Sequence, residues 1–156
     1  MKIIKIIAII ILALFAIGLI AGKASGISLL SLNMHDEIYS EDGMALGGYD
    51  PVQLYANGEA ILGNEDIQTD WKDLTWRFTT EENQSTFLAN PEQYIPASGG
   101  HCAFAVGKGF AAPGNPNFAY QTKDGKVYLF SNKEVMEDAM NNIDQVVRDA
   151  DINWDK

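Results

Sequence analysis

FAYQTKDGKVYLFSNKEVMEDAMNNIDQVVRDA, residues 118–150, decides the fold class, because it joins a hairpin pattern to a helix pattern. Aromatic and β-branched residues flank Asp124-Gly125, a dipeptide that favours a tight turn between two antiparallel strands. Ser131 and Glu134 then form a capping box, which is typical of a helix start. The apolar residues that follow recur three and four positions apart, as on one helix face: Val135, Met136, Ala139, Met140, Ile143, Val146, Val147 and Ala150. A hairpin of short antiparallel strands followed by an amphipathic C-terminal helix predicts a small α+β domain.

The chain upstream alternates short strands with short helices in the same way. LTWRF, residues 74–78, is typical of a half-buried strand, and Thr79 with Glu82 forms a second capping box. Closer to the N-terminus, Asp50 is placed to cap a short helix that has Pro51 at its first position. We find no internal sequence repeat, and we predict a single folded domain.

Residues 1–23, MKIIKIIAIIILALFAIGLIAGK, form the most apolar segment of the chain. The run from Ile6 to Gly22 contains no charge. As a helix it spans about 26 Å, slightly less than the ~30 Å hydrocarbon core of a bilayer, and Lys5 can extend the span by snorkelling. The run is longer than the ~7–15 apolar residues of a typical signal peptide, and no good A-x-A cleavage site follows it. We therefore favour a signal-anchor over a cleaved signal peptide.

Both interpretations place the rest of the chain on the same side of the membrane. Lys2 and Lys5 favour retention of the N-terminus in the cytoplasm, so the residues after Lys23 lie on the other side. We predict a stalk over residues 24–43 and the α+β domain over residues 44–156. The domain is then held outside the cytoplasm at the inner (cytoplasmic) membrane, or it is periplasmic or secreted if the leader is cleaved. The expected partners are the membrane, through the N-terminal helix, and a protein at that membrane.

The composition excludes one class of partner and restricts the chemistry of the thiol. The formal net charge is −10 and no basic patch is visible, so nucleic-acid binding is not expected. The chain has one cysteine, Cys102, which cannot form an internal disulfide. Outside the cytoplasm such a thiol must be buried, pair with another molecule, bind a metal or react.

SGGHCAFAVGKG, residues 98–109, surrounds Cys102 and His101 with small residues and allows three interpretations. In the first, Cys102 and His101 ligate copper or zinc, with Met34-His35 from the stalk as a second half of the site. Adjacent side chains diverge on a helix or a strand, which disfavours joint ligation by His101 and Cys102.

In the second interpretation Cys102 is a catalytic thiol for redox or nucleophilic chemistry. A helix that begins near Gly100 would place Cys102 in its first turn, where the helix dipole favours a thiolate. Because there is no second cysteine, a disulfide cycle would need an external thiol or a second copy of the chain. In the third interpretation the thiol is structural, since free cysteine packs as a small buried residue and the neighbouring glycines permit close approach. The sequence alone leaves all three open.

Five motifs, in this order, resemble YHS domain-containing proteins of the exported or membrane-anchored bacterial type. They are GGYDPVQLY at 47–55, WRF at 76–78, FLANPEQY at 87–94, GGHCAFAVGKG at 99–109 and DGKVYLF at 124–130. The resemblance implies a small α+β scaffold over about residues 46–154. It also implies metal binding, because YHS modules of metal-handling proteins carry cysteines after DPV and in an FCSxxC stretch.

This chain departs from that pattern at each of the expected cysteines. Gln53, Thr79 and Asn83 occupy those positions, and all three are poor ligands for soft metals such as copper. In the longer exported subfamily that this chain resembles more closely, a thiol or its selenium counterpart occupies the position of Cys102. The resemblance therefore directs attention to Cys102 without assigning its role.

From these observations we predict a membrane-tethered extracytoplasmic binding or accessory module rather than a self-sufficient enzyme. Any site is expected to centre on Cys102 and His101, with Tyr49 and Asp50 as neighbours. The alternatives are a thiol-dependent redox protein that uses Cys102 and a purely structural partner of a membrane complex.

Overall fold

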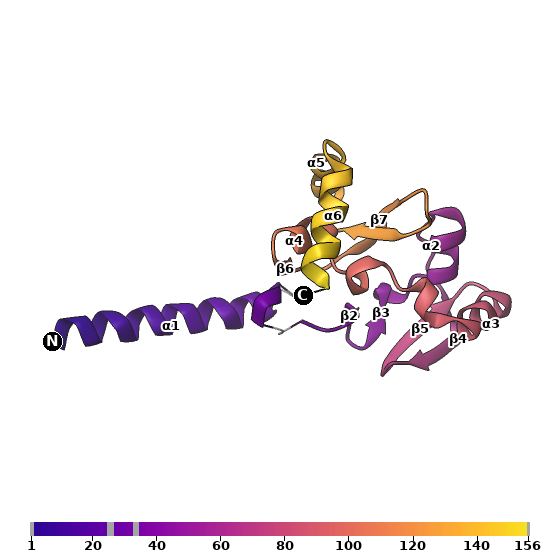
Figure 1. The fold of residues 1–156 in the computed structure, drawn as a ribbon. Helices are drawn as coiled ribbons and strands as arrows, with labels where there is room; N and C mark the ends of the chain where they lie inside the picture. Colours follow the sequence, from indigo (N-terminus) through magenta and orange to yellow (C-terminus); the bar gives the residue numbers. More distant parts are fainter. Residues whose placement is uncertain (1, 25–26, 33–34, 156) are drawn as a thin grey trace.

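The computed structural model describes residues 2–24, 27–32 and 35–155. Helix α1 (Lys2–Ala24) projects from the folded part of the chain as a single rod (Figure 1). Its stretch Ile4–Gly22 is long and apolar enough to cross a membrane, and large side chains such as Ile20 are exposed along it. The N-terminal apolar helix expected from the sequence is therefore present.

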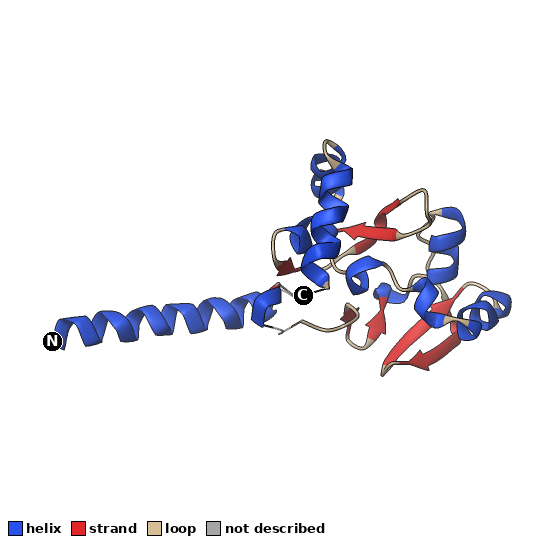
Figure 2. Cartoon of the chain, in the orientation of Figure 1, coloured by secondary structure: helices blue, strands red, loops and turns tan. Residues whose placement is uncertain are grey.

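The remainder of the described chain is an α+β domain, as predicted (Figure 2). Its strands are β1 (Ser28–Leu29), β2 (Ser40–Glu41), β3 (Met44–Ala45), β4 (Asn64–Trp71), β5 (Leu74–Phe78), β6 (Phe110–Ala111), β7 (Asn115–Gln121) and β8 (Val127–Phe130). Its α-helices are α2 (Pro51–Asn57), α3 (Glu81–Ala89), α4 (Ala103–Gly107), α5 (Lys133–Met140) and α6 (Ile143–Trp154). Short 3-10 turns lie at η1 (Leu30–Leu32), η2 (Leu46–Gly48), η3 (Pro91–Tyr94) and η4 (Ala97–Gly100).

The strands form three small sheets with mainly antiparallel pairing. The largest has the order β2-β3-β5-β4, in which β3 and β5 pair in parallel through Met44 and Thr75. Strands β7 and β8 form the predicted hairpin around Asp124-Gly125. Strand β1 pairs with β6, which joins the segment after α1 to the domain.

Two parts of the domain have the same order of main elements. This structural repeat was not detected in the sequence. The first repeat runs through η2, α2, β4, β5 and α3, and the second runs through η4, α4, β7, β8 and α5, with the additional two-residue strand β6 between α4 and β7. Both begin with three residues of positive φ: Leu46, Gly47 and Gly48 at 51°, 60° and 82°, and Ser98, Gly99 and Gly100 at 56°, 61° and 84°. In both repeats a residue with extended backbone comes next, followed by the N-cap of a helix. These two residues are Tyr49 and Asp50 in the first repeat and His101 and Cys102 in the second.

The hydrogen bonds of the connecting loops agree as well. The N-cap residue in each repeat donates its N–H to the loop before the next strand, from Asp50 to the Ile61 carbonyl at 2.8 Å and from Cys102 to the Ala112 carbonyl at 2.9 Å. Each repeat then has an asparagine whose side-chain oxygen accepts a hydrogen bond from the backbone N–H two residues later. Asn64 accepts from Asp66 and Asn115 accepts from Asn117, each at 3.0 Å. The two halves therefore share one backbone plan with different side chains.

The starts of two helices differ from the prediction by one residue. The N-caps are Thr80 and Asn132, not Thr79 and Ser131. The predicted caps are shifted because their hydroxyls bond elsewhere: Thr79 donates to Asp50, and Ser131 donates to the Pro113 carbonyl at 2.8 Å. The single C-terminal helix expected from the apolar stripe is also divided into α5 and α6, at Asn141 and Asn142.

Strand β8 separates two apolar clusters because its side chains alternate between its faces. Val127 and Leu129 belong to the cluster around Trp76, Phe78 and Phe87, whereas Tyr128 and Phe130 belong to the cluster around Cys102, Val106 and Ala150. The segment assigned to a stalk reaches this core, since Ile38 is buried in the first cluster. Trp154, near the C-terminus, packs against the second cluster.

Candidate functional site

Cys102 lies inside the domain. Its side chain is 1 % exposed and packs with Ala103, Val106 and Ala112 in the second apolar cluster. It occupies the N-cap of α4, but its side chain forms no capping hydrogen bond with the described part of the chain. The preceding Gly99 lies against the backbone of the stalk segment, where a Cβ atom would collide with the Glu37 carbonyl oxygen.

This environment bears on the three interpretations of the thiol. A reactive cysteine needs a partly exposed sulfur in a setting that favours the thiolate. A sulfur sealed among alanine and valine side chains behaves instead as a small apolar group. The glycines beside it serve close backbone contact, so the burial favours the structural interpretation.

His101 is also buried, at 3 % exposure, and it joins the stalk segment to the domain. Its Nε2 lies 3.0 Å from the Asp36 carbonyl oxygen, which can only accept, so Nε2 carries the hydrogen. Its Nδ1 has no hydrogen-bond partner among the described residues. Burial is the main cause that lowers the pKa of His101, so the ring is neutral at neutral pH.

The rings of His35, Tyr39 and Trp154 surround His101. The His35 and His101 ring centroids are 6.0 Å apart in an edge-on arrangement, and Trp154 lies 5.3 Å from His101. The structure thus brings together the two histidines of the metal interpretation, whereas Met34 lies outside the described residues.

These two histidines do not complete a metal site. Within residues 2–24, 27–32 and 35–155, no group of three or more His, Cys, Asp or Glu side chains is placed to hold a metal ion. Structural zinc sites need four ligands, and the imidazole pair supplies two. The donor set around His101 and Cys102 therefore does not fit zinc.

The three positions at which the resemblance expects cysteines do converge, but on a carboxylate. Asp50 is fully buried, and its Oδ2 accepts from the Thr79 N–H, the Thr79 hydroxyl and the Asn83 amide, each at 2.7 Å. Its Oδ1 accepts from the N–H groups of Val52 at 2.8 Å and Gln53 at 3.1 Å. Five donors stabilise this buried charge and fix α2 against β5 and α3.

The same network argues against a soft metal at these positions. The Thr79 hydroxyl and the Asn83 amide already bond Asp50, and the Gln53 side chain accepts from Asn57 at 2.6 Å. Hydroxyl and amide groups are in any case weak ligands for copper. The residues present do not fit the metal that the resemblance implies.

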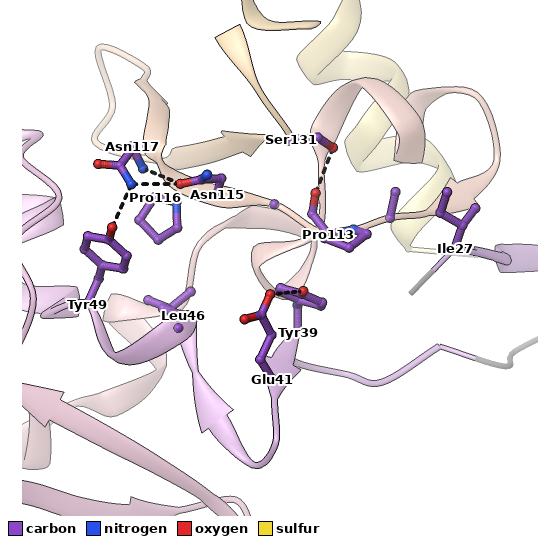
Figure 3. A pocket seen from close by; sticks show the side chains of 13 residues that line it. Ile27, Tyr39, Glu41, Leu46, Tyr49, Pro113, Asn115, Pro116, Asn117 and Ser131 are labelled. Carbon is purple, nitrogen blue, oxygen red and sulfur yellow. Dashed lines mark hydrogen bonds between the residues drawn. The ribbon is translucent and has the colours of Figure 1, made fainter. Parts of the chain in front are cut away.

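The surface has a cleft of about 490 Å³ that the sequence did not predict (Figure 3). Its lining comes mainly from three segments, through Tyr39 and Glu41, through Leu46, Gly47 and Tyr49, and through residues 112–117; Ile27 and Ser131 complete it. Leu46, Ala112 and Pro116 are buried and give it an apolar floor. A pocket with an apolar lining and a few fixed polar groups is the usual form of a binding site.

The polar groups of the cleft are held by hydrogen bonds among themselves. The Tyr39 hydroxyl donates to Glu41 Oε1 at 2.7 Å, and desolvation together with this carboxylate raises the pKa of Tyr39. The Asn117 amide donates to the Tyr49 hydroxyl at 2.8 Å and to Asn115 Oδ1 at 3.0 Å. Figure 3 shows these side chains, with their hydrogen bonds, among the residues that line the cleft.

The residues predicted for a site are thus distributed over three places. Cys102 and His101 lie behind the wall of the cleft, since Cys102 N–H bonds Ala112 and His101 pairs with Pro113. Tyr49 lines the cleft, whereas Asp50 belongs to the buried network of the first repeat. The sequence signal that was available for the cleft is Asn115-Pro116-Asn117, a turn-like stretch directly before an aromatic strand.

No protein-family model matches this chain, and neither does any curated protein or solved structure.

Proposed function

We propose that this chain is a membrane-tethered extracytoplasmic accessory module of the YHS type that binds a partner protein at the membrane through the cleft of residues 39–49 and 112–117. One observation carries the proposal: the cleft is open and lined by two tyrosines, whereas Cys102 and His101 are sealed. Tyrosine is enriched at protein interfaces because it combines apolar area with a hydroxyl.

The position of the cleft supports a partner at the membrane. Ile27, which follows α1 after two residues, lines the cleft, so the cleft opens near the end of the proposed anchor. The lysines before the span favour the orientation in which the domain lies outside the cytoplasm. A module tethered in this way needs only a modest contact area, because confinement to the membrane raises its effective concentration.

The thiol-dependent alternative receives less support. Redox or nucleophilic chemistry requires access of a second molecule to the sulfur, and the Cys102 side chain is 1 % exposed. Metal binding is disfavoured by the donor sets described above.

Photocrosslinking in intact cells tests the proposal with the full-length chain. A benzophenone amino acid replaces Asn117 in the cleft or, as the matched control, Asn141, which is an exposed asparagine between α5 and α6. We expect one membrane-associated protein adduct at Asn117, identified by mass spectrometry, that Tyr49→Ala weakens and that Asn141 does not give. Equal adducts at both positions, or extraction of the full chain from membranes by alkali, contradict the proposal.

A further inference from the structure

We propose that a groove between α1 and the β1–β6 pair holds the acyl chain of a bilayer lipid from the leaflet on the domain's side. The inference rests on the membrane tether of the proposed function and adds a lipid-binding site to it. The groove adjoins the cleft described above, and Ile27 contributes to the lining of both.

The groove has a volume of about 360 Å³ and two apolar walls. One wall is a single face of α1, since residues four positions apart lie one above the other on a helix. The other wall is formed by the domain, from residues 27–29, which come shortly after α1 in the chain, and from β6. The residues that define the two walls are Leu14, Gly18 and Gly22 on α1 and Ile27, Leu29 and Phe110 on the domain.

The depth of the groove matches one leaflet. Leu14 and Gly22 both lie within the stretch proposed to cross the membrane. The helix rises about 12 Å over the eight steps from Leu14 to Gly22. Half of the ~30 Å hydrocarbon core is about 15 Å, so the groove runs from the middle of the bilayer to the headgroups.

The outer end of the groove is built for contact with lipid rather than water. The Phe110 side chain is 42 % exposed and that of Ile27 is 45 % exposed. Both line the groove beside α1, where β1 contacts the helix and pairs with β6, the strand that contains Phe110. Exposed apolar side chains at this depth are stabilised by burial in the headgroup–acyl boundary.

A second copy of α1 is a less suitable occupant. Gly18 and Gly22 have the spacing of small residues that allows close pairing of membrane helices. The chain itself covers Gly22, because the Ile27 N–H donates to the Gly22 carbonyl at 2.8 Å and a Cβ there would lie 2.7 Å from the Ile27 carbonyl oxygen. A helix about 10 Å wide would meet the domain at this point, whereas an acyl chain is narrower and ends there.

Gly18 provides the test position. A Cβ at Gly18 would lie in open space, and Gly18 lines the groove, so Gly18→Leu adds a side chain that projects into the groove. Ala16→Leu adds a side chain to the opposite face of α1 and is the matched control. Leu88 on α3, 51 % exposed and distant from α1 in Figure 1, reports non-specific labelling of the domain.

The experiment uses the full-length chain in vesicles of phosphatidylethanolamine and phosphatidylglycerol that contain a phospholipid with a diazirine in its acyl chain. After irradiation, adducts are mapped by mass spectrometry. We expect adducts on α1 and on the peptide that contains Phe110, and the peptide that contains Leu88 remains unlabelled. Gly18→Leu lowers the Phe110 adduct several-fold, and Ala16→Leu leaves it unchanged.

The outcomes separate the two proposals. Adducts on α1 without an adduct at Phe110, or a Phe110 adduct that Gly18→Leu does not lower, overturn the groove and leave the tether intact. An α1 that takes up no diazirine label overturns the tether itself. Crosslinks between two copies of α1 in place of the lipid adduct assign the groove to a second chain and also overturn the lipid site.

Discussion

Asp50 and Cys102 occupy the same place in the two repeats, yet they have opposite surroundings. Each follows a glycine pair of positive φ, occupies the N-cap position of a short helix and donates its N–H to the loop ahead. The Asp50 side chain accepts five hydrogen bonds. The Cys102 side chain is buried in the second apolar cluster. One backbone frame therefore supports a polar network in the first repeat and close apolar packing in the second.

The comparison shows which residue of such a motif carries information on function. Both repeats need the glycines for backbone with positive φ, so the glycines indicate backbone geometry and not a functional site. The residue at the cap decides whether its helix is fixed by hydrogen bonds or by packing. The predictions below test this difference, in order of decreasing effect.

Loss of the Asp50 carboxylate is expected to have the largest effect. Asp50→Ala leaves five donors without their acceptor in a buried position, which should cost about 3–5 kcal/mol of unfolding free energy. Asp50→Asn keeps one acceptor oxygen and should cost less. Urea unfolding followed by tryptophan fluorescence measures both variants. A loss near 1 kcal/mol for Asp50→Ala, the scale of a single hydrogen bond, would show that the network does not fix the first repeat.

The equivalent glycines Gly47 and Gly99 provide a matched pair. Their φ angles are 60° and 61°, so alanine should cost about 1–2 kcal/mol at either position through the left-handed backbone alone. At Gly47 the nearest described atom to a Cβ is Tyr49 Cδ2 at 3.9 Å, whereas at Gly99 the Glu37 carbonyl blocks it. Gly99→Ala should therefore cost about 1–3 kcal/mol more than Gly47→Ala. Equal midpoints of thermal unfolding for the two variants would contradict the close packing of the second repeat.

At position 102 we expect the variant with an apolar residue to be more stable than the variant with a polar residue. Cys102→Ala removes only the sulfur and should cost about 1 kcal/mol. Cys102→Ser buries a hydroxyl among apolar neighbours and should cost about 1–3 kcal/mol. Denaturant midpoints of the two variants give the order directly. A serine variant more stable than the alanine variant would indicate a polar partner for the Cys102 position.

The smallest expected effect is a dependence on pH that arises from His101. Burial lowers the pKa of His101 in the folded domain below the ordinary value of about 6.5, so the unfolded chain takes up the proton first. The stability due to the neutral ring is complete above that ordinary pKa and is lost as the pH falls below it. The thermal midpoint of the wild type should fall more between pH 7 and pH 5 than that of His101→Gln. Parallel pH profiles of the wild type and His101→Gln would show that His101 is not the source of the dependence.

Local patterns predicted much of the fold. The Asp124-Gly125 hairpin, the Asp50 cap and the strand at 74–78 are all present, because each depends on residues adjacent in sequence. The caps at Thr79 and Ser131 were wrong by one residue, because their hydroxyls bond partners far along the chain. The repeat was missed because the two halves share little beyond the glycine pairs, the Asn turns and the alternation of apolar residues.

The candidate site was less predictable than the fold. The cleft combines Tyr39, Tyr49 and Asn117, which are brought together only by the tertiary arrangement. The His-Cys pair attracted attention as rare residues in a glycine-rich segment, but rarity does not distinguish a buried residue from an accessible one. The metal interpretation did place His35 beside His101, and the two rings are close, but the 66 positions between them meant that no local pattern could establish this contact.

The central claim is that the second repeat uses its thiol for packing, and the alkylation rate of Cys102 tests it most directly. The full-length chain is treated with a maleimide at neutral pH, folded or in urea, and the adduct is followed by mass spectrometry. We predict that the folded protein reacts far more slowly than the unfolded protein, because the sulfur is released only by opening of the domain. Alkylation of the folded protein at the rate of the unfolded chain would contradict the account.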